Sequence, residues 1–313
     1  MHFKHLAATA RLWAAVSLLA LTGAAVNLPL SEARWVSPGR VTAALTRQPV
    51  ECLAVPADQS AAKQIAIGRA AFRTPMLLGG QAARAGLSCA SCHRNGRSNR
   101  DFFLTGLSDA PGTADVTSSL MSKSRGDALF NPKPITDLAA GAATHKISRD
   151  ARSGDLERFI TGQIVEEFDG HAPPPRVLAG LAAYVRAIRP DACPRSVDEP
   201  ITVGALLDEI EAAADAARDT DAATARLMLS SARSTLGKID ERYTTAELDA
   251  VRVQIRAADR GLADIQKSLD VGDQAVIQQI DDWQRMFAVL RPAIKRASSR
   301  SLFNPARLSP VPR

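Results

Sequence analysis

Apolar residues recur every three to four positions over several stretches of the chain, which is the period of an amphipathic α-helix. Before position 200 this pattern predicts three helices, over about 60–72, 155–168 and 176–188. After position 200 it predicts up to four longer helices, over about 202–218, 221–242, 245–269 and 273–296. Alanine is abundant and aromatic residues make up only 4% of the chain, which also favours helices over strands. We therefore expect an all-α fold.

The composition changes near position 200. Residues 201–298 contain no cysteine or histidine and no proline before Pro292, whereas the preceding half is rich in proline and glycine. The segment from Arg94 to Ile147 has no helical period and carries turn-forming pairs such as Asn95-Gly96. These features predict a loop-rich domain over 34–199 that begins with a loose leader. They also predict a separate helical bundle or hairpin over 200–298 and a loose basic tail over 299–313. Thr244 and Glu247 have the spacing of a capping box for the third bundle helix.

The first 33 residues resemble an export signal. Basic residues precede an uncharged run from Leu12 to Val26. Ser31-Glu32-Ala33 offers small residues for cleavage, and Ala24-Ala25 offers an earlier alternative. The uncharged run is shorter than the roughly 20 residues of a spanning helix, which favours cleavage over a membrane anchor. We expect a periplasmic protein that contacts the membrane only if this segment stays uncleaved.

Charge and cysteine content narrow the function further. The formal net charge is +6, but no basic patch is interleaved with aromatic residues, which argues against a nucleic-acid partner. Of the four cysteines, Cys52 and Cys193 stand at the two ends of the loop-rich domain. In an oxidising compartment they can form a disulfide, and two unpaired thiols are the alternative.

The other two cysteines lie in Cys89-Ala90-Ser91-Cys92-His93, which has the C-x-x-C-H spacing of c-type haem attachment. In that chemistry both thiols bond covalently to the porphyrin, and the histidine is the proximal iron ligand. A thioredoxin-like site would need a βαβ context, and a zinc site would need a second pair of ligands. We therefore expect one covalently bound haem c, around which the long loops pack.

The surroundings of the motif resemble the bacterial di-haem cytochrome c peroxidase family. The stretches that carry the resemblance are Gly68–Phe72, Leu87–His93, Thr117–Leu120 and Leu156–Phe159. The resemblance covers roughly residues 60–190, and it implies a cytochrome c-like haem domain. Similarity to c-type cytochromes also implies that the first and last helices of this domain cross, with Gly68 and Phe72 against Leu181 and Tyr184.

This chain departs from that family in three ways. It has one haem motif rather than two. The family's catalytic histidine corresponds to about Arg149-Asp150 here, and its methionine ligand corresponds to about Gln163. We therefore assign no catalytic residue.

The ligand on the other face of the iron decides between electron transfer and chemistry with peroxide or a gas. Met121 is the first candidate, because it lies in a loop downstream of the motif at a distance typical of small cytochromes. His145 is the second candidate, and His171 and Met76 are weaker ones. Met228 and Met286 have helical spacing and are expected in the core of the bundle.

Together these observations predict an exported mono-haem c-type cytochrome that exchanges electrons with a redox partner protein. One alternative is a peroxidase-like haem enzyme whose second redox centre lies on a partner chain. Another is a sensor or scaffold in which the haem binds a gas ligand and the bundle transmits the signal.

Overall fold

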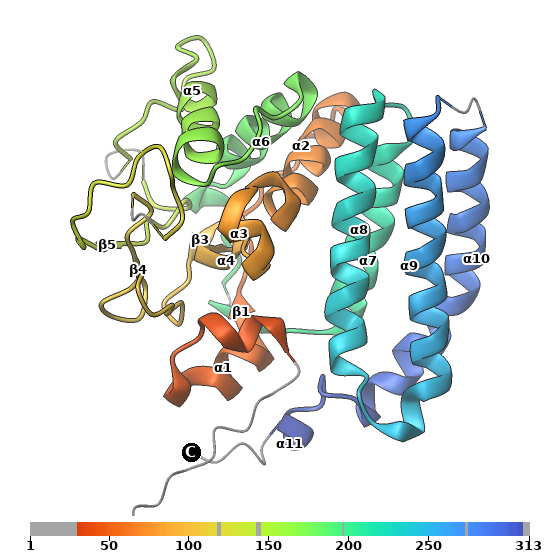
Figure 1. Cartoon of the computed structure of the whole chain (residues 1–313). Coiled ribbons are helices and arrows are strands. Elements are labelled where there is room, and N and C mark those ends of the chain that lie inside the picture. Colours follow the sequence, from red (N-terminus) through yellow and green to blue (C-terminus); the bar gives the residue numbers. More distant parts are fainter. Residues whose placement is uncertain (1–29, 118–119, 142–144, 196, 273–274, 309–313) are drawn as a thin grey trace, which may run out of the picture.

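Helices dominate the protein, and its strands form only short two-stranded pairs. The computed structural model describes residues 30–117, 120–141, 145–195, 197–272 and 275–308. The predicted all-α class is confirmed (Figure 1).

All three helices predicted before position 200 are present. Helix α2 (Gln59–Phe72) begins at Asp58, whose carboxylate accepts a hydrogen bond from the amide of Ala61 at 2.7 Å. The other two are α5 (Asp155–Gly162), which continues as the π-helical turn η5 (Gln163–Glu167), and α6 (Pro175–Ala187). The region between α2 and α5 is irregular, as expected. The elements in its described part are short: η3 (Pro75–Leu77), α3 (Gly80–Ala85), α4 (Cys89–Cys92), β2 (His93–Arg94), β3 (Arg97–Ser98), β4 (Thr113–Ala114) and β5 (Lys133–Pro134).

The C-terminal half contains the four predicted long helices. They are α7 (Val203–Ala217), α8 (Ala222–Arg242), α9 (Asp249–Asp270) and α10 (Val276–Ala297). The predicted capping box is wrong, because a 3-10 turn η7 (Ala246–Leu248) precedes α9 and Glu247 pairs with Arg307 at 2.9 Å instead. Met228 is fully buried as expected. Met286 is 42% exposed and is not a core residue, because its position on α10 faces away from the other helices.

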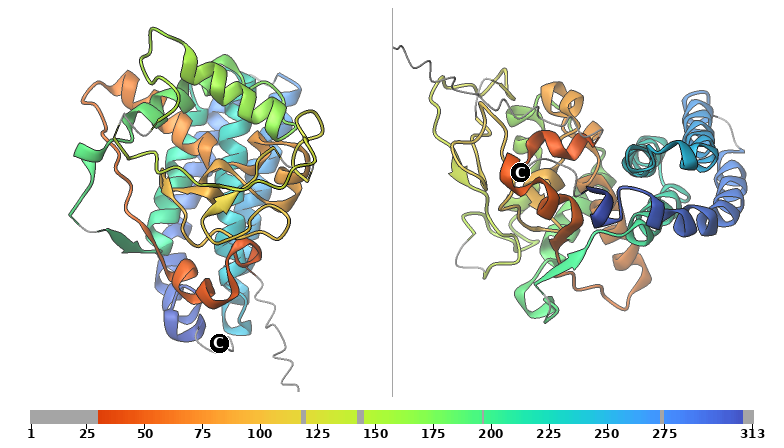
Figure 2. Two further views of the ribbon diagram at one scale, coloured as in Figure 1. Left: turned by 90° about the vertical axis from the view of Figure 1, so that its left-hand side faces the viewer. Right: turned by 90° about the horizontal axis from the view of Figure 1, so that it is seen from below.

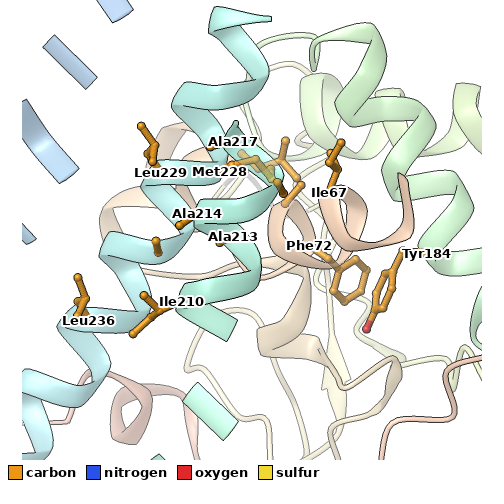
Figure 3. Close-up of a cluster of buried hydrophobic side chains, with 14 of the residues drawn as sticks. Ile67, Phe72, Tyr184, Ile210, Ala213, Ala214, Ala217, Met228, Leu229 and Leu236 are labelled. Atoms are coloured by element: carbon orange, nitrogen blue, oxygen red, sulfur yellow. The ribbon is translucent and has the colours of Figure 1, made fainter. Parts of the chain in front are cut away.

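The bundle is not separate from the rest of the protein, and this expectation was wrong. Helix α2 packs against both α7 and α8, so that one apolar core runs through both halves of the chain (Figure 3). In that core Ile67 of α2 lies beside Ala213, Ala217 and Met228, which come from the two bundle helices. Small alanine side chains let these helices approach closely, and periodicity alone does not reveal which partner such a face contacts.

The described parts of the leader and the tail are packed rather than loose. Leu30, Leu45 and Leu308 bury one another in a small second apolar cluster, which fixes the start of the described chain to its end. The elements involved are η1 (Ser31–Trp35), η2 (Pro38–Arg40), α1 (Val41–Thr46), β1 (Arg47–Pro49), η6 (Pro190–Ala192), β6 (Asp198–Pro200), η8 (Ser298–Arg300) and α11 (Pro305–Leu308). β1 pairs with β6 in an antiparallel ribbon, and α11 lies beside α1 in the view from below (Figure 2). The uncharged run Leu12–Val26 and the last five positions lie outside the described residues.

Candidate functional site

The two motif cysteines lie on α4, a single helical turn that Ser88 and Ser91 cap reciprocally. Both thiols are free, and both side chains are partly buried against the main core. A spacing of three residues on one helical turn puts the two sulfur atoms on the same side of the chain. This is the arrangement that two thioether bonds to one porphyrin edge require.

His93 follows α4 directly, and its ring is held by a backbone carbonyl. Strand β2 pairs with β3 through a tight turn at Asn95-Gly96, where both residues have positive φ. The Nδ1 atom of His93 lies 2.9 Å from the carbonyl oxygen of Thr136. A carbonyl oxygen only accepts, so Nδ1 carries the proton and Nε2 carries the free lone pair. Histidines that bind metal are oriented in this way.

Burial sets the protonation of all three motif side chains. It raises the pKa of the Cys89 and Cys92 thiols to about 12, and it lowers the pKa of His93. The imidazole is therefore neutral at neutral pH, as an iron ligand must be. Thiols of dithiol oxidoreductases have lowered pKa values instead, so these values do not support the thioredoxin-like alternative.

No three histidine, cysteine or acidic side chains converge as a metal site in the described part of the chain. A structural zinc site needs four ligands around one point, so the described residues give no support to the zinc alternative. A c-type haem makes a different demand, since the thiols reach the porphyrin edge and the imidazole reaches its centre. Cys89, Cys92 and His93 supply the two thiols and the imidazole that such a group requires.

The predicted crossing of two helices is confirmed behind the motif. Gly68 of α2 packs directly on the backbone of Gly180 and Leu181 of α6. The Phe72 ring faces that of Tyr184 (Figure 3), and their centroids are 5.1 Å apart. The centroid of the Phe72 ring lies 6.3 Å from that of the His93 ring. This contact joins the His93 ring to the pair of crossing helices.

A buried ionic network extends this contact, and sequence reasoning missed it. The Tyr184 hydroxyl donates to Glu51 at 2.7 Å, and Arg69 and Arg73 pair with the same carboxylate. Burial alone would raise the pKa of Glu51, but the two guanidinium charges outweigh it and hold the pKa at about 2. Single charges scattered along a helical pattern give no sequence signature of such a network.

The candidates for the second iron ligand differ in their surroundings. Met121 is 3% exposed and lies in the main core, next to Ser122, whose hydroxyl donates to the carbonyl of Glu166. His145 is partly buried, and its Nε2 lies 3.0 Å from the carbonyl oxygen of Ala140. His171 is exposed and Met76 is 65% exposed. Met121 is thus the candidate whose side chain is buried and whose thioether sulfur is not engaged in a strong hydrogen bond, unlike the imidazole of His145.

The predicted pairing of Cys52 with Cys193 is present as a disulfide. Cys52 is fully buried, and Cys193 is exposed. The bridge joins the segment before α2 to the segment after α6, across a sequence separation of 141. It therefore closes the chain around the whole motif region.

A cavity of about 80 Å³ lies between α4 and the bundle. Ser88, Ala90 and Ser91 line it from the motif side, and Lys238 and Arg242 line it from α8. The cysteine and histidine side chains of the motif do not line it. This cavity therefore separates the motif from the bundle, and it is not a porphyrin-binding pocket.

Comparison with known proteins leaves the family open. No helix in the described part of the chain is both long and apolar enough to cross a membrane. The sequence matches no protein-family model, no curated protein and no solved structure.

Proposed function

We propose that this protein is an exported mono-haem c-type cytochrome that transfers single electrons. The observation that carries the proposal is the geometry of His93, whose Nδ1 is engaged by the Thr136 carbonyl while Nε2 remains available. Cys89 and Cys92 precede it as free thiols on one helical turn. Such a haem accepts and releases one electron at its iron, and the protein sets its potential through the axial ligands and their hydrogen bonds.

Export is part of the proposal, because c-type haems are attached outside the cytoplasm. The disulfide between Cys52 and Cys193 supports an oxidising compartment. We place the protein in the periplasm, where a redox partner protein would supply or accept its electron.

We propose Met121 as the second axial ligand. A thioether in that position stabilises ferrous iron and gives a closed, electron-transferring centre. Met121→Ala should open the sixth position, so that the reduced variant binds carbon monoxide and the wild type does not. Met76→Ala is the matched control, because Met76 is exposed and its loss should leave the spectrum unchanged.

One observation favours a peroxidase-like enzyme as the second candidate. Glu167, at the end of η5, is buried, and its Oε2 has no hydrogen-bond partner among the described residues. Burial raises its pKa, as expected for a carboxyl group that exchanges protons during catalysis. It lies beside the Met121 loop, because Arg125 of that loop approaches its carboxylate at 3.6 Å.

Absorption spectra of the purified ferric and ferrous protein, with and without carbon monoxide, separate these functions. An electron-transfer protein should be low-spin and six-coordinate in both states and should not bind carbon monoxide. A wild-type protein that binds the gas and reduces peroxide with an electron donor would favour the enzyme instead. Gas binding without peroxide turnover would favour a sensor.

A further inference from the structure

The loop that presents the Thr136 carbonyl to His93 is held at several points. The amide of Leu138 donates to the carbonyl of Gly96 at 3.0 Å, which ties the loop to the turn after His93. Arg149 donates to the carbonyl of Leu138 at 2.8 Å and to that of Ile188 at 3.1 Å, which ties the loop to the end of α6.

The most direct attachment is an ion pair next to Thr136. The Nε of Arg97 lies 2.9 Å from both carboxylate oxygens of Asp137, the residue that follows Thr136. Arg97 belongs to β3, the strand that pairs with His93. Its Nη1 also lies 3.3 Å from the Sγ of Cys52, one half of the disulfide. The pair is partly buried, with side-chain exposures of 24% and 30%.

We propose that Arg97 and Asp137 are positioning residues for the proximal ligand, an inference that rests on the proposed haem function. Arg97 is anchored to the strand of His93 and to the disulfide, and it fixes Asp137. The adjacent Thr136 carbonyl is thereby held within hydrogen-bond distance of Nδ1. Neither residue touches the iron or the porphyrin in this proposal, and both act through the Thr136 carbonyl.

This hydrogen bond affects the iron through the imidazole. When Nδ1–H donates to a fixed acceptor, the ring becomes more basic and Nε2 becomes a stronger donor. A stronger donor stabilises ferric iron, so the bond lowers the reduction potential. Loosening the loop should weaken the bond, raise the potential and let the Nδ1 proton exchange faster with solvent.

The test compares Arg97→Gln with Asp137→Asn in the haem-loaded protein. A purely electrostatic effect would shift the potential in opposite directions, since one variant loses a positive charge and the other a negative charge. Positioning predicts that both variants raise the potential. It also predicts that exchange of the His93 Nδ1 proton, followed by NMR, becomes about fivefold faster, the equivalent of one ordinary hydrogen bond. Arg97→Lys keeps the positive charge but loses the forked geometry of the guanidinium group. It should therefore raise the reduction potential and speed the proton exchange by smaller amounts.

Asp150→Asn is the matched control, because it removes an exposed ion pair with Arg152 and should change neither quantity. Opposite shifts of potential, or unchanged proton exchange in both variants, would overturn the inference and leave the haem function intact. A wild-type protein without covalent haem would overturn the function itself. Haem content and circular dichroism are measured for every variant, so that a misfolded variant is recognised. If Arg97→Gln does not fold, Arg97→Lys takes its place in the comparison with Asp137→Asn.

Discussion

Gly68 and Gly180 bring the two helices behind the motif into backbone contact. A Cβ at Gly68 would overlap the carbonyl group of Gly180 and would lie 2.7 Å from the amide nitrogen of Leu181. Gly68→Ala should therefore force α2 and α6 apart and lower the free energy of unfolding by about 3 kcal/mol. Urea unfolding, followed by circular dichroism, measures this change.

Gly237 provides the control, because it lies within α8 and, apart from its chain neighbours and the surrounding helix backbone, no atom lies within 4 Å of a Cβ built there. Gly237→Ala should raise the free energy of unfolding by about 0.5–1 kcal/mol, through the better helix propensity of alanine. Equal effects of the two substitutions would show that the close helix contact does not determine stability.

Stability should depend on acid through Glu51. Its folded-state pKa of about 2 lies below the ordinary value of 4.5, so its contribution is complete above pH 4.5 and is lost as the pH falls towards 2. Glu51→Gln should cost about 3 kcal/mol at pH 7, because it leaves Arg73 buried without this partner. The difference between wild type and variant should shrink between pH 4.5 and 2.

Urea unfolding at several pH values checks this prediction. Asp191→Asn is the control, because Asp191 is 68% exposed and its removal should change stability by less than about 0.5 kcal/mol. A Glu51→Gln variant that keeps wild-type stability at pH 7 would contradict the role assigned to the network.

Reduction of the disulfide should destabilise the protein. For a closed loop of this length the loss of chain entropy in the unfolded state corresponds to about 5 kcal/mol. Cys193→Ser should show this loss, measured by urea unfolding. A reductant should bring the wild type down to the level of the variant and should leave the variant unchanged. A wild type that is insensitive to reductant after full unfolding and refolding would count against a stabilising bridge.

Of the two candidate cleavage sites in the predicted export segment, the structure favours the earlier one. Glu32 pairs with Arg94 and Lys238, and the Ser31 amide donates to Glu241 at 2.8 Å. Burial would raise the pKa of Glu32, but these cations hold it at about 2. Cleavage after Ala33 would remove all three contacts and leave Arg94, Lys238 and Glu241 without these partners. The mature protein should therefore begin before Leu30, near Ala24-Ala25, as N-terminal sequencing of the exported protein would show. A mature chain that starts at Arg34 would contradict this prediction.

Much of the fold could be predicted because it depends on local periodicity. The seven main helices have apolar faces that repeat at 3.6 residues, and such a pattern is read without knowledge of the partner face. The disulfide could be predicted because only Cys52 and Cys193 remain outside the motif. The packing of the bundle against the first half of the chain could not be predicted, because nothing in the alanine-rich sequence of α7 indicates that α2 covers it.

The candidate site also has one part that the sequence reveals and another part that it does not. Cys89, Cys92 and His93 are recognisable because their chemistry fixes residue type and spacing. The acceptor at Thr136 is a backbone carbonyl, which any residue supplies, so no sequence pattern marks it. Arg97 and Asp137 are 40 positions apart and meet only through the folded loop.

Covalent haem attachment is the central claim, and intact mass of the denatured protein tests it most directly. The chain is expressed with its export segment in a host that attaches c-type haem, beside a known cytochrome as positive control. We predict that the wild type carries the mass of one haem after denaturation and that the Cys89→Ala, Cys92→Ala double variant carries none. A wild-type chain with the bare polypeptide mass, while the control cytochrome is fully loaded, would contradict the account.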